Sequence, residues 1–334
     1  MILTVTVNPS FDRTIDLAEP LQHGQVQRVS HSTQEPGGKG VNVSRALQAA
    51  GCATLAILPG DAGDPMVEAL GAAGIPVECV PVGASIRANT TITEPDGTTT
   101  KLNEPGAPIS PDALDGIVDL VARRSAAASW VVLAGSLPPG APADFYARIV
   151  AAIRQRAARD GVSAPSIAVD SSGDPLSALL SSGETVDLIK PNGEELLAVA
   201  GALGEPVAGI PVDDFEADEA QVVAVAQSLL SPTLGRVLVT LGSRGALLVS
   251  EQHVLAARAP VIVARSTVGA GDCSLAGYLL ATERGAAAAE ALAQAVAHGA
   301  AAASLPGSTV PTPDLTHPGD IVVSHRPRVV AGRR

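Results

Sequence analysis

The sequence has 334 residues, of which 46% are hydrophobic and 2% aromatic, so its interior has to consist mainly of Ala, Val, Leu and Ile. A chain of this length and apolar content can bury a core without disulfide or metal support, which excludes bulk disorder. The formal net charge of -12 at pH 7 argues against a protein that coats nucleic acid or an anionic membrane. An anionic substrate must therefore be bound by a local cluster of basic side chains.

The three cysteines, Cys52, Cys79 and Cys273, are an odd number at wide spacing without a CxxC pair, which fits a reducing compartment. Residues 1–9 carry no basic leader segment, and no apolar run reaches the roughly 18 residues that a membrane span needs. We therefore expect a cytoplasmic protein with no membrane partner and no nucleic-acid partner.

Apolar runs of strand length alternate with Ala-rich stretches of helical periodicity along most of the chain. The pattern predicts strands at residues 2–7, 54–58, 130–134, 167–170, 188–190 and 236–240, and helices at residues 41–50, 65–73, 111–128, 142–159, 194–200, 218–230 and 272–284. Uninterrupted Val, Leu and Ile runs are typical of parallel strands that are covered on both faces. The sequence thus predicts an α/β fold with an open, largely parallel sheet.

Two polar, Thr-rich segments interrupt this alternation, at residues 11–36 and 84–106. Both contain alternating polar and apolar positions, and Asp96-Gly97 is a hairpin signal in the second. They either pair as a small antiparallel sheet that forms a lid, or they are two ordinary surface hairpins. We expect the lid.

The remaining segments set the domain organisation. A Pro- and Gly-rich loop is expected at residues 201–215, and residues 325–334 contain four arginines and no acid, which is typical of a solvated tail. No internal repeat and no clean linker is present. We therefore expect one domain over residues 1–316, with the lid as part of it, and an Arg-rich tail over residues 317–334.

The strongest chemical signal is Thr-Val-Gly-Ala-Gly-Asp at residues 267–272, between a strand-like run at 259–264 and a predicted helix. Consecutive backbone N–H groups of a Gly-rich turn that opens a helix form a positive nest, to which the helix dipole adds. Such a nest can stabilise the charge of a phosphoryl group. Asp272 would lie at its mouth, where a carboxylate can accept the proton of an attacking hydroxyl; the alternative is that Asp272 only caps the helix.

A second Gly-rich turn, Gly-Gly-Lys-Gly-Val-Asn-Val-Ser-Arg, occupies residues 37–45. Its glycines allow a ligand to approach the backbone, Lys39 offers a positive charge to a phosphate, and the Asn42 amide can bond sugar hydroxyls. The order of residues is not that of a Walker A loop. Taken alone, the turn could equally be a tight loop with an exposed lysine.

Together these motifs resemble the signatures of the ribokinase-like (PfkB) family of sugar kinases, in order and at the family's spacing. The two signatures are GGKGVNVSRALQAAG at residues 37–51 and STVGAGDCSLAG at residues 266–277, and further family landmarks lie at residues 8–12, 135–140, 190–195 and 240–245. The resemblance runs from Met1 to about Thr312. It implies a three-layer αβα sandwich with a largely parallel central sheet and a small β-sheet lid.

The resemblance also implies roles for individual residues. Asp272 matches the catalytic base, and Gly269, Ala270 and Gly271 match the anion hole for the transferring phosphoryl group. The positions that match the sugar pocket, or that lie along it and the lid, are Asp12, Gly38, Lys39, Asn42, Arg87, Asn103 and Ser136. Lys39 and Arg87, with Lys101 as a further candidate, would bind a phosphate already present on the sugar.

The resemblance further implies ATP and Mg²⁺. Asn192 and Glu195 match the motif that orders the magnesium shell through water. The positions that match or adjoin the nucleotide contacts are Lys190, Thr240, Gly242, Ser243, Gly245, Gly271 and His298. His298 itself is interpreted as a packing or rim residue of a helix beside the adenine.

The basic pocket and the form of the motifs resemble most closely the subfamily of 1-phosphofructokinase and tagatose-6-phosphate kinase, which also has Ser at the position of Ser266. The expected reaction is phosphorylation of fructose 1-phosphate by ATP, with 6-phosphofructokinase or tagatose-6-phosphate kinase activity as the alternatives. A catalytically silent sensor of sugar phosphate or nucleotide is the alternative outside enzymes. A dehydrogenase is disfavoured because no GxGxxG follows the first strand. The resemblance also implies a homodimer formed through the lid.

Overall fold

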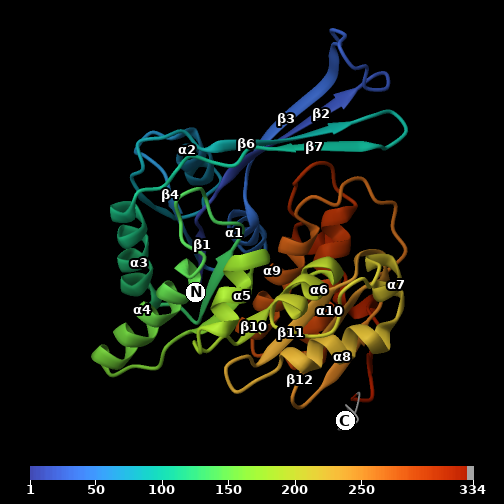
Figure 1. Ribbon diagram of the computed structural model, residues 1–334. Coiled ribbons are helices and arrows are strands. Elements are labelled where there is room, and N and C mark those ends of the chain that lie inside the picture. Colours follow the sequence, from blue (N-terminus) through green and yellow to red (C-terminus); the bar gives the residue numbers. More distant parts are fainter. Residues whose placement is uncertain (329–334) are drawn as a thin grey trace.

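A ten-stranded sheet forms the centre of the computed structural model, which describes residues 1–328 (Figure 1). The strand order is β14-β13-β12-β11-β10-β9-β8-β1-β4-β5. Its parallel strands are β1 (Ile2–Thr6), β4 (Thr54–Pro59), β5 (Val77–Val80), β8 (Trp130–Ala134), β9 (Ser166–Asp170), β10 (Leu188–Ile189) and β11 (Arg236–Thr240). The antiparallel edge consists of β12 (Ala246–Ser250), β13 (Val254–Ala257) and β14 (Val323–His325).

The central strands are buried on both faces, which explains their uninterrupted apolar runs. Every residue of β8 is buried: Val131 and Leu133 belong to one hydrophobic core, and Trp130 and Val132 to the other. Successive side chains of a strand point to opposite faces, so a single run of five apolar residues supplies both cores. The expectation of a parallel sheet covered on both sides is confirmed.

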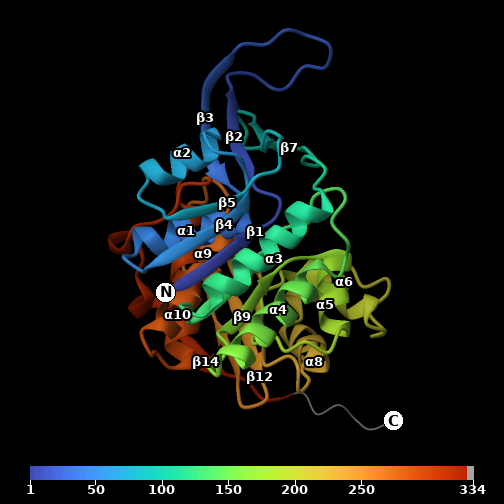
Figure 2. The ribbon, with the colours of Figure 1, turned by 90° about the vertical axis from the view of Figure 1, so that its left-hand side faces the viewer.

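Helices cover the sheet on both sides (Figures 1 and 2). One face carries α3 (Pro111–Ser125), α4 (Phe145–Asp160), α5 (Gly173–Ser181), α6 (Gly193–Ala202), α7 (Val212–Ala217) and α8 (Glu219–Leu229). The other face carries α1 (Lys39–Ala49), α9 (Ala270–Glu283) and α10 (Ala288–Ala303), while α2 (Pro65–Ala72) packs Met66 and Leu70 against α1 and β4. The molecule is the expected three-layer αβα sandwich.

A separate four-stranded sheet, here called the lid, projects from one end of the sandwich (Figure 1). It contains β2 (Ser10–Leu17), β3 (Val29–Gly37), β6 (Arg87–Thr93) and β7 (Thr99–Asn103) in the order β3-β2-β6-β7. The two Thr-rich segments supply two strands each. The lid is mixed and not purely antiparallel, because β2 pairs with β6 in parallel across the two segments.

Three expectations for individual segments were wrong in whole or in part: the strand at residues 259–264, the loop at residues 201–215 and the solvated tail at residues 325–334. Residues 259–264 are not a strand: β13 ends at Ala257, and Val261 and Val263 are exposed beyond it. Pro260 has no N–H to donate to a sheet, so the apolar run does not extend the strand. The expected loop at 201–215 contains most of α7, whose Phe215 is fully buried.

The expected solvated tail is also ordered in its first part. Residues Val323–His325 form β14 at the edge of the main sheet, and Arg326 pairs with Glu219 of α8. The 3₁₀ turns η2 (Pro313–Leu315) and η3 (Pro318–Asp320) lead into this strand. The last arginines of the expected tail, in residues 329–334, lie outside the described residues.

No helix within residues 1–328 is both long and apolar enough to span a membrane. Cys52, Cys79 and Cys273 are all free thiols.

Candidate active site

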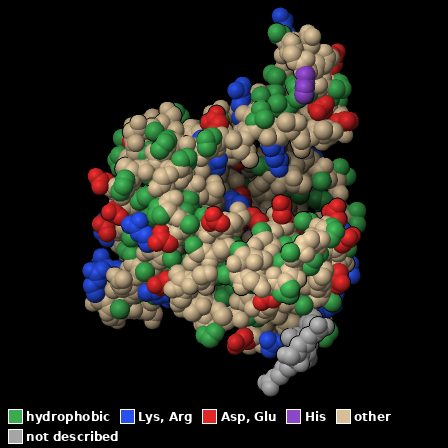
Figure 3. All heavy atoms as spheres, in the orientation of Figure 1, with side chains coloured by type: hydrophobic (Ala, Val, Ile, Leu, Met, Phe, Trp, Pro, Cys, Tyr) green, Lys and Arg blue, Asp and Glu red, His purple; other side chains and the backbone are tan. Residues whose placement is uncertain are grey.

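A cavity of about 250 Å³ lies between the lid and the sandwich. Figure 3 shows a hollow below the lid with acidic and basic side chains in and around it. The cavity is lined by Asn8, Asp12, Gly38, Lys39, Asn42, Arg87, Asn89, Thr91, Lys101, Asn103, Gly135, Ser136, Val268, Gly269 and Asp272. The two Gly-rich turns, which are more than 200 residues apart in the sequence, therefore meet in one place.

The topology explains why these segments meet. Asn8, Gly135 and Lys190 follow the neighbouring parallel strands β1, β8 and β10, and Asp170 is the last residue of β9. In an open parallel sheet the carboxyl ends of the strands share one edge, and ligands bind in the crevice outside that edge. The lid covers this edge, and the first turns of α1 and α9 complete the enclosure.

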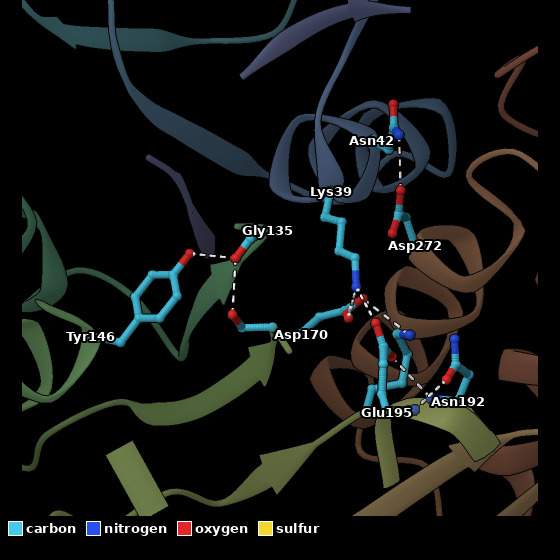
Figure 4. Close-up of polar contacts among 10 residues, drawn as sticks. Lys39, Asn42, Gly135, Tyr146, Asp170, Asn192, Glu195 and Asp272 are labelled. Atoms are coloured by element: carbon cyan, nitrogen blue, oxygen red, sulfur yellow. Dashed lines mark hydrogen bonds and ion pairs between the residues drawn. The ribbon is translucent and has the colours of Figure 1, made fainter. Parts of the chain in front are cut away.

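Asp272 occupies the first turn of α9 and is only 7% exposed. One of its carboxylate oxygens, Oδ2, accepts a hydrogen bond of 2.8 Å from the Nδ2 group of Asn42 in α1 (Figure 4). Burial and the nearby charge of Asp170 raise the pKa of Asp272 to about 6, although Lys39 and the Asn42 hydrogen bond oppose the rise. Asp272 is thus a carboxylate that can take a proton near neutral pH.

The glycines before Asp272 leave the backbone bare. Gly269 precedes α9 with a φ of 74°, in the left-handed region that favours glycine. The first backbone N–H groups of a helix lack an intrahelical acceptor, and here they belong to Ala270, Gly271 and Asp272. A side chain at Gly271 would place its Cβ 3.3 Å from Lys190 Nζ. Ala270 N donates to Thr267 O at a long 3.4 Å. The predicted anion hole therefore consists of the amides of Gly271 and Asp272, with the weakly bonded Ala270 amide and an ammonium group beside them.

Four charged groups form a network behind Asp272 (Figure 4). Lys39 Nζ lies 2.8 Å from Asp170 Oδ1 and 3.0 Å from Glu195 Oε1, and Lys190 Nζ lies 3.0 Å from Asp170 Oδ2. Burial alone would raise the pKa of Asp170, but Lys190 and Lys39 hold it below its usual value. Burial would lower the pKa of Lys39, but Asp170 and Glu195 raise it. Both lysine side chains are therefore directed at carboxylates.

The side chain of Lys39 points elsewhere than the sequence analysis expected. There, its ammonium group was expected to bind the phosphate of the sugar. Lys39 lines the cavity, but two carboxylates already share its charge. Asp170 was missed altogether. A signal was available, because an acid directly after a buried parallel strand lies at the binding edge of such a sheet.

Asn192 and Glu195 form a capping box at the start of α6. Glu195 N donates to Asn192 Oδ1 at 2.7 Å, and Asn192 N donates to Glu195 Oε2 at 3.0 Å. The other carboxylate oxygen of Glu195 faces Lys39. Within residues 1–328 no group of three His, Cys, Asp or Glu side chains is close enough to hold a metal directly.

The sugar side of the cavity contains Asp12 and Arg87. Ser10 Oγ donates to Asp12 Oδ1 at 3.0 Å, and burial raises the pKa of Asp12. Gly37 lets this carboxylate approach, because a Cβ there would lie 2.3 Å from Asp12 Oδ2. The Arg87 guanidinium donates to the backbone oxygens of Glu104 and Asn8, which holds it at the cavity wall.

Ser136 and Asn103 also line the cavity, as does Gly38, whose φ is 99°. The loop that carries Ser136 is anchored at Gly135, whose carbonyl accepts hydrogen bonds from Tyr146 and Ser171 (Figure 4). The sequence did not assign roles to Asn89 and Thr91, which lie on β6 and face the same cavity. Alternate residues of a strand point to the same face, so Asn89 and Thr91 share the face of Arg87. The periodicity of the strand could therefore have identified both residues.

The residues predicted to bind nucleotide lie beside the cavity and do not line it. Thr240 ends β11 and bridges to Asn192, Gly242 and Ser243 are part of the 3₁₀ turn η1 (Gly242–Arg244), and Gly245 follows that turn. A Cβ at Gly245 would lie 2.0 Å from the carbonyl oxygen of Ala257, so this glycine is required for packing. Their contacts with a nucleotide stay a prediction.

His298 is 2% exposed and packs between α10 and α9. Its Nδ1 atom lies 2.8 Å from Gln294 Nε2 and 3.1 Å from Gln294 O, and burial lowers the pKa of the ring to about 4. The structure thus gives His298 a packing role, and a contact with the nucleotide stays a prediction.

A family model described as pfkB family carbohydrate kinase matches residues 5–315. The chain belongs to this family. It is 34% identical to 1-phosphofructokinase of Haloferax volcanii, over 93% of each chain, and 31% identical to ATP-dependent 6-phosphofructokinase isozyme 2 of Escherichia coli, over 94% of this chain and 96% of the relative. It also resembles the crystal structure of phosphofructokinase-2 from Escherichia coli in complex with substrates and products, with a TM-score of 0.82, 29% identity and coverage of 94% and 96% of the two chains.

The carbohydrate kinase inferred from the two Gly-rich signatures is confirmed by this membership. The protein is an ATP-dependent phosphotransferase whose acceptor is a sugar hydroxyl.

Proposed function

We propose that the protein phosphorylates the 6-hydroxyl of fructose 1-phosphate with ATP and thereby makes fructose 1,6-bisphosphate and ADP. The relative from Haloferax volcanii supports this choice, because it is named for this activity and matches 93% of the chain. The charges of the cavity also support it. Arg87 and Lys101 lie on its lid strands β6 and β7, and two cations at one wall suit an acceptor that already carries a phosphate.

The observation that carries the proposal is the setting of Asp272. Its carboxylate lies in the cavity wall beside the bare turn of Gly269 and Gly271, and its pKa is raised to about 6. A base with this pKa is deprotonated at neutral pH and still accepts a proton from a hydroxyl as the oxygen attacks.

In the proposed mechanism, Asp12 and Asn42 orient the sugar so that its free primary hydroxyl faces Asp272. Asp272 takes the hydroxyl proton while the oxygen bonds to the terminal phosphorus of ATP and the bond from that phosphorus to the ADP oxygen breaks. The amides of Ala270 and Gly271 and the ammonium of Lys190 stabilise the negative charge of the phosphoryl group in transit. The lid excludes water from the cavity, which limits transfer to water.

We assign the phosphate of the acceptor to Arg87 and Lys101, with Ser136 and Asn103 as hydrogen-bonding neighbours. All four line the cavity: Arg87, Lys101 and Asn103 come from the lid, and Ser136 comes from the loop after β8. Lys39 is the weaker candidate for this role, because Asp170 and Glu195 already neutralise its ammonium.

The residues present fit a magnesium ion bound largely through water. Asp170 and Glu195 already share one cation, Lys39, and carboxylate oxygens are ligands that Mg²⁺ accepts while it keeps several waters. We propose that Asp170, Glu195 and Asn192 hold this water shell. When bound, the ion supplies positive charge to the phosphate oxygens of the nucleotide.

We also propose a cytoplasmic homodimer that forms through the lid. β3 is an edge strand of the lid, and its residues from Val29 to Gln34 are all exposed. Two further apolar side chains of the lid are exposed as well, Val26 in the hairpin before β3 and Leu102 in β7. Exposed edge strands are normally covered or paired. In sedimentation velocity, Val29→Glu should shift a dimer toward monomer, whereas Val322→Glu at the far edge of the body should not; a wild-type monomer would contradict the proposal.

The deciding experiment measures ADP release with fructose 1-phosphate, fructose 6-phosphate, tagatose 6-phosphate and unphosphorylated fructose, each with MgATP. We expect the highest kcat/KM with fructose 1-phosphate. A preference for either 6-phosphate would replace the proposed acceptor and leave the kinase in place. Binding of ATP and sugar phosphate without ADP release from any of them would favour the sensor.

A further inference from the structure

Arg45 of α1 lies at a junction of three segments, although it does not line the cavity. Its side chain is 13% exposed, and Nη2 lies 3.0 Å from Glu35 Oε2. Nη1 donates to the carbonyl oxygens of Pro36 at 2.9 Å and Ser308 at 3.1 Å and to Asn42 Oδ1 at 3.3 Å. These acceptors come from the end of β3 in the lid, from α1 itself and from the segment after α10.

The partners of Arg45 are themselves fixed. Glu35 Oε2 accepts a second hydrogen bond, of 2.9 Å, from Ser308 Oγ, and Thr309 Oγ1 donates to Glu35 Oε1 at 3.4 Å. A guanidinium held by one carboxylate and two backbone carbonyls has little freedom to rotate. Nη1 has two hydrogens for its three acceptors, so Asn42 Oδ1 shares one of them with a backbone carbonyl. Arg45 still presents a donor, and no acceptor, to Asn42 from a fixed direction.

This direction determines which way the Asn42 amide faces. An arginine can only donate hydrogen bonds and an ionised carboxylate can only accept them. Because Arg45 donates to Oδ1, the Nδ2 group is left to donate to Asp272 Oδ2, at 2.8 Å. A flipped amide would bring two oxygens together at Asp272 and two sets of donors together at Arg45.

We propose that Arg45 is a positioning residue for the catalytic base: it orients the Asn42 amide, which holds Asp272 Oδ2 and leaves Oδ1 to the acceptor hydroxyl. This inference rests on the proposed role of Asp272. The same arginine is bonded to the end of β3, so the seating of the lid and the orientation of the base depend on one side chain.

The proposal predicts the direction of an effect on the pH profile. A hydrogen bond to the charged form of an acid lowers its pKa. The other groups that act on Asp272 are Asp170, which raises its pKa, and Lys39 and Lys190, which lower it. None of them contacts Arg45. The charge of Arg45 also reaches this part of α9, since it lowers the pKa of Cys273. Loss of Arg45 therefore acts on the Asp272 pKa both through Asn42 and through the lost charge, and both effects raise it.

The test compares pH profiles of kcat/KM for the full-length wild type, Arg45→Met, Asn42→Ala and the double variant. We expect Arg45→Met to raise the midpoint of the acidic limb by about 0.5–1 pH unit and to lower kcat about tenfold. In the Asn42→Ala background the same substitution should displace the limb by less than half as much, because only the loss of the arginine's charge then acts on Asp272. Substrate phosphates titrate in this range too, but they contribute equally to all four profiles.

Arg284→Met is the matched control. Its Nη2 group donates to the carbonyl oxygen of Ala50, at the other end of α1, at 3.1 Å. Arg284 follows α9 and contacts the far end of α1 without touching Asn42, so the acidic limb of this variant should stay at the wild-type position. If Arg45→Met does not fold, Arg45→Lys takes its place, because one ammonium cannot reproduce the fork of contacts.

Two results would overturn the proposal: an unchanged limb in the Arg45 variant, or an equal displacement with and without Asn42. Its failure differs from failure of the proposed function. If Asp272→Asn is inactive while the Arg45 variant keeps the wild-type limb, only the positioning role is lost. If Asp272→Asn retains turnover, the role of the base itself is wrong.

Discussion

Lys39 Nζ lies 2.8 Å from Asp170 Oδ1, although 131 residues separate the two in the chain. The contact joins the first turn of α1 to the carboxyl end of β9, on opposite walls of the binding edge. Because Asp170 is fully buried, its charge depends on Lys39 and Lys190 for compensation. The ion pair is thus a structural tie between the two halves of the site as well as part of its charge balance.

Lys39→Met should destabilise the protein. Removal of one partner leaves Asp170 with a single lysine, and incomplete compensation of a buried charge costs about 1–3 kcal/mol. Urea unfolding at pH 7.5 measures the loss. Arg156→Met, which breaks an exposed pair with Asp160, is the control and should change the free energy of unfolding by less than about 0.5 kcal/mol. Equal losses in the two variants would refute the special position of Lys39.

Asp272→Asn should lower kcat by about three or more decades with little change in the KM of either substrate, because the lost proton transfer belongs to the transition state. Steady-state ADP release measures both parameters. Asp174→Asn, in the first turn of α5, is a matched substitution at a helix start outside the cavity and should leave kcat unchanged. Normal turnover of Asp272→Asn would remove Asp272 from the mechanism.

The same substitution should make the protein more stable at pH 7. The folded-state pKa of Asp272, about 6, lies above its unfolded value of 3.8, so between these pH values the folded state binds more protons than the unfolded state. Stability therefore falls as the pH rises through this window. Asp272→Asn removes the buried charge and should raise the Tm at pH 7 by about 2–6 °C. A scan at pH 4 is the control, since there the gain should largely disappear.

Activity has the opposite pH dependence. The base must be unprotonated, so kcat/KM should fall as the pH drops below about 6 and should be level above it until another group titrates. A profile measured from pH 4.5 to 8.5 tests this. An acidic limb centred near 4, the ordinary value of an aspartic acid, would show that burial and Asp170 do not act on the base as the structure indicates.

The sequence predicts the parts of this molecule in which local pattern and tertiary environment agree. Strands such as β8 are uninterrupted apolar runs because both faces are buried, and α9 follows its Gly-rich turn. β5 was missed because its four residues are all half-buried and show no contrast between faces. Residues 259–264 have the composition of a strand, but Pro260 and the lack of a pairing partner leave them irregular.

Within the site, the two glycine turns and Asp272 could be predicted because glycine and aspartate at fixed spacing have a local meaning. The direction of Lys39 could not be predicted, since it depends on Asp170 and Glu195, which are distant in the chain. The same holds for Arg45, whose contacts come from segments up to 263 residues away. Charge networks that form between elements leave no periodic pattern in the sequence.

Arg87→Ala should act on binding of the phosphosugar. Its guanidinium is held at the cavity wall by two backbone oxygens, so it meets the acceptor phosphate without reorganising. Loss of one charge-assisted contact of this kind raises the KM of fructose 1-phosphate about 10- to 100-fold, with a smaller effect on kcat and none on the KM of ATP. Arg124→Ala, which removes an arginine paired with Glu78 outside the cavity, should leave both KM values unchanged. An unaltered KM in Arg87→Ala would move the acceptor phosphate elsewhere.

A comparison of Gly269→Ala with Gly285→Ala separates the effect of backbone strain from the effect on catalysis. The two glycines lie just outside the two ends of α9. Gly269 has a φ of 74° and Gly285 a φ of 78°, and a Cβ at Gly285 would meet no atom within 4 Å. Alanine at either position is forced into the left-handed region and should destabilise the protein by about 1–2 kcal/mol.

At Gly269 the added Cβ would also lie 3.6 Å from Asn42 Nδ2 and 4.0 Å from Asp272 Oδ2, within the proposed anion site. Gly269→Ala should therefore lower kcat about 100-fold, as expected when preorganised donors are displaced, while Gly285→Ala keeps wild-type kcat. Equal kcat values in the two variants, measured below their unfolding temperatures, would show that the turn at Gly269 only begins the helix.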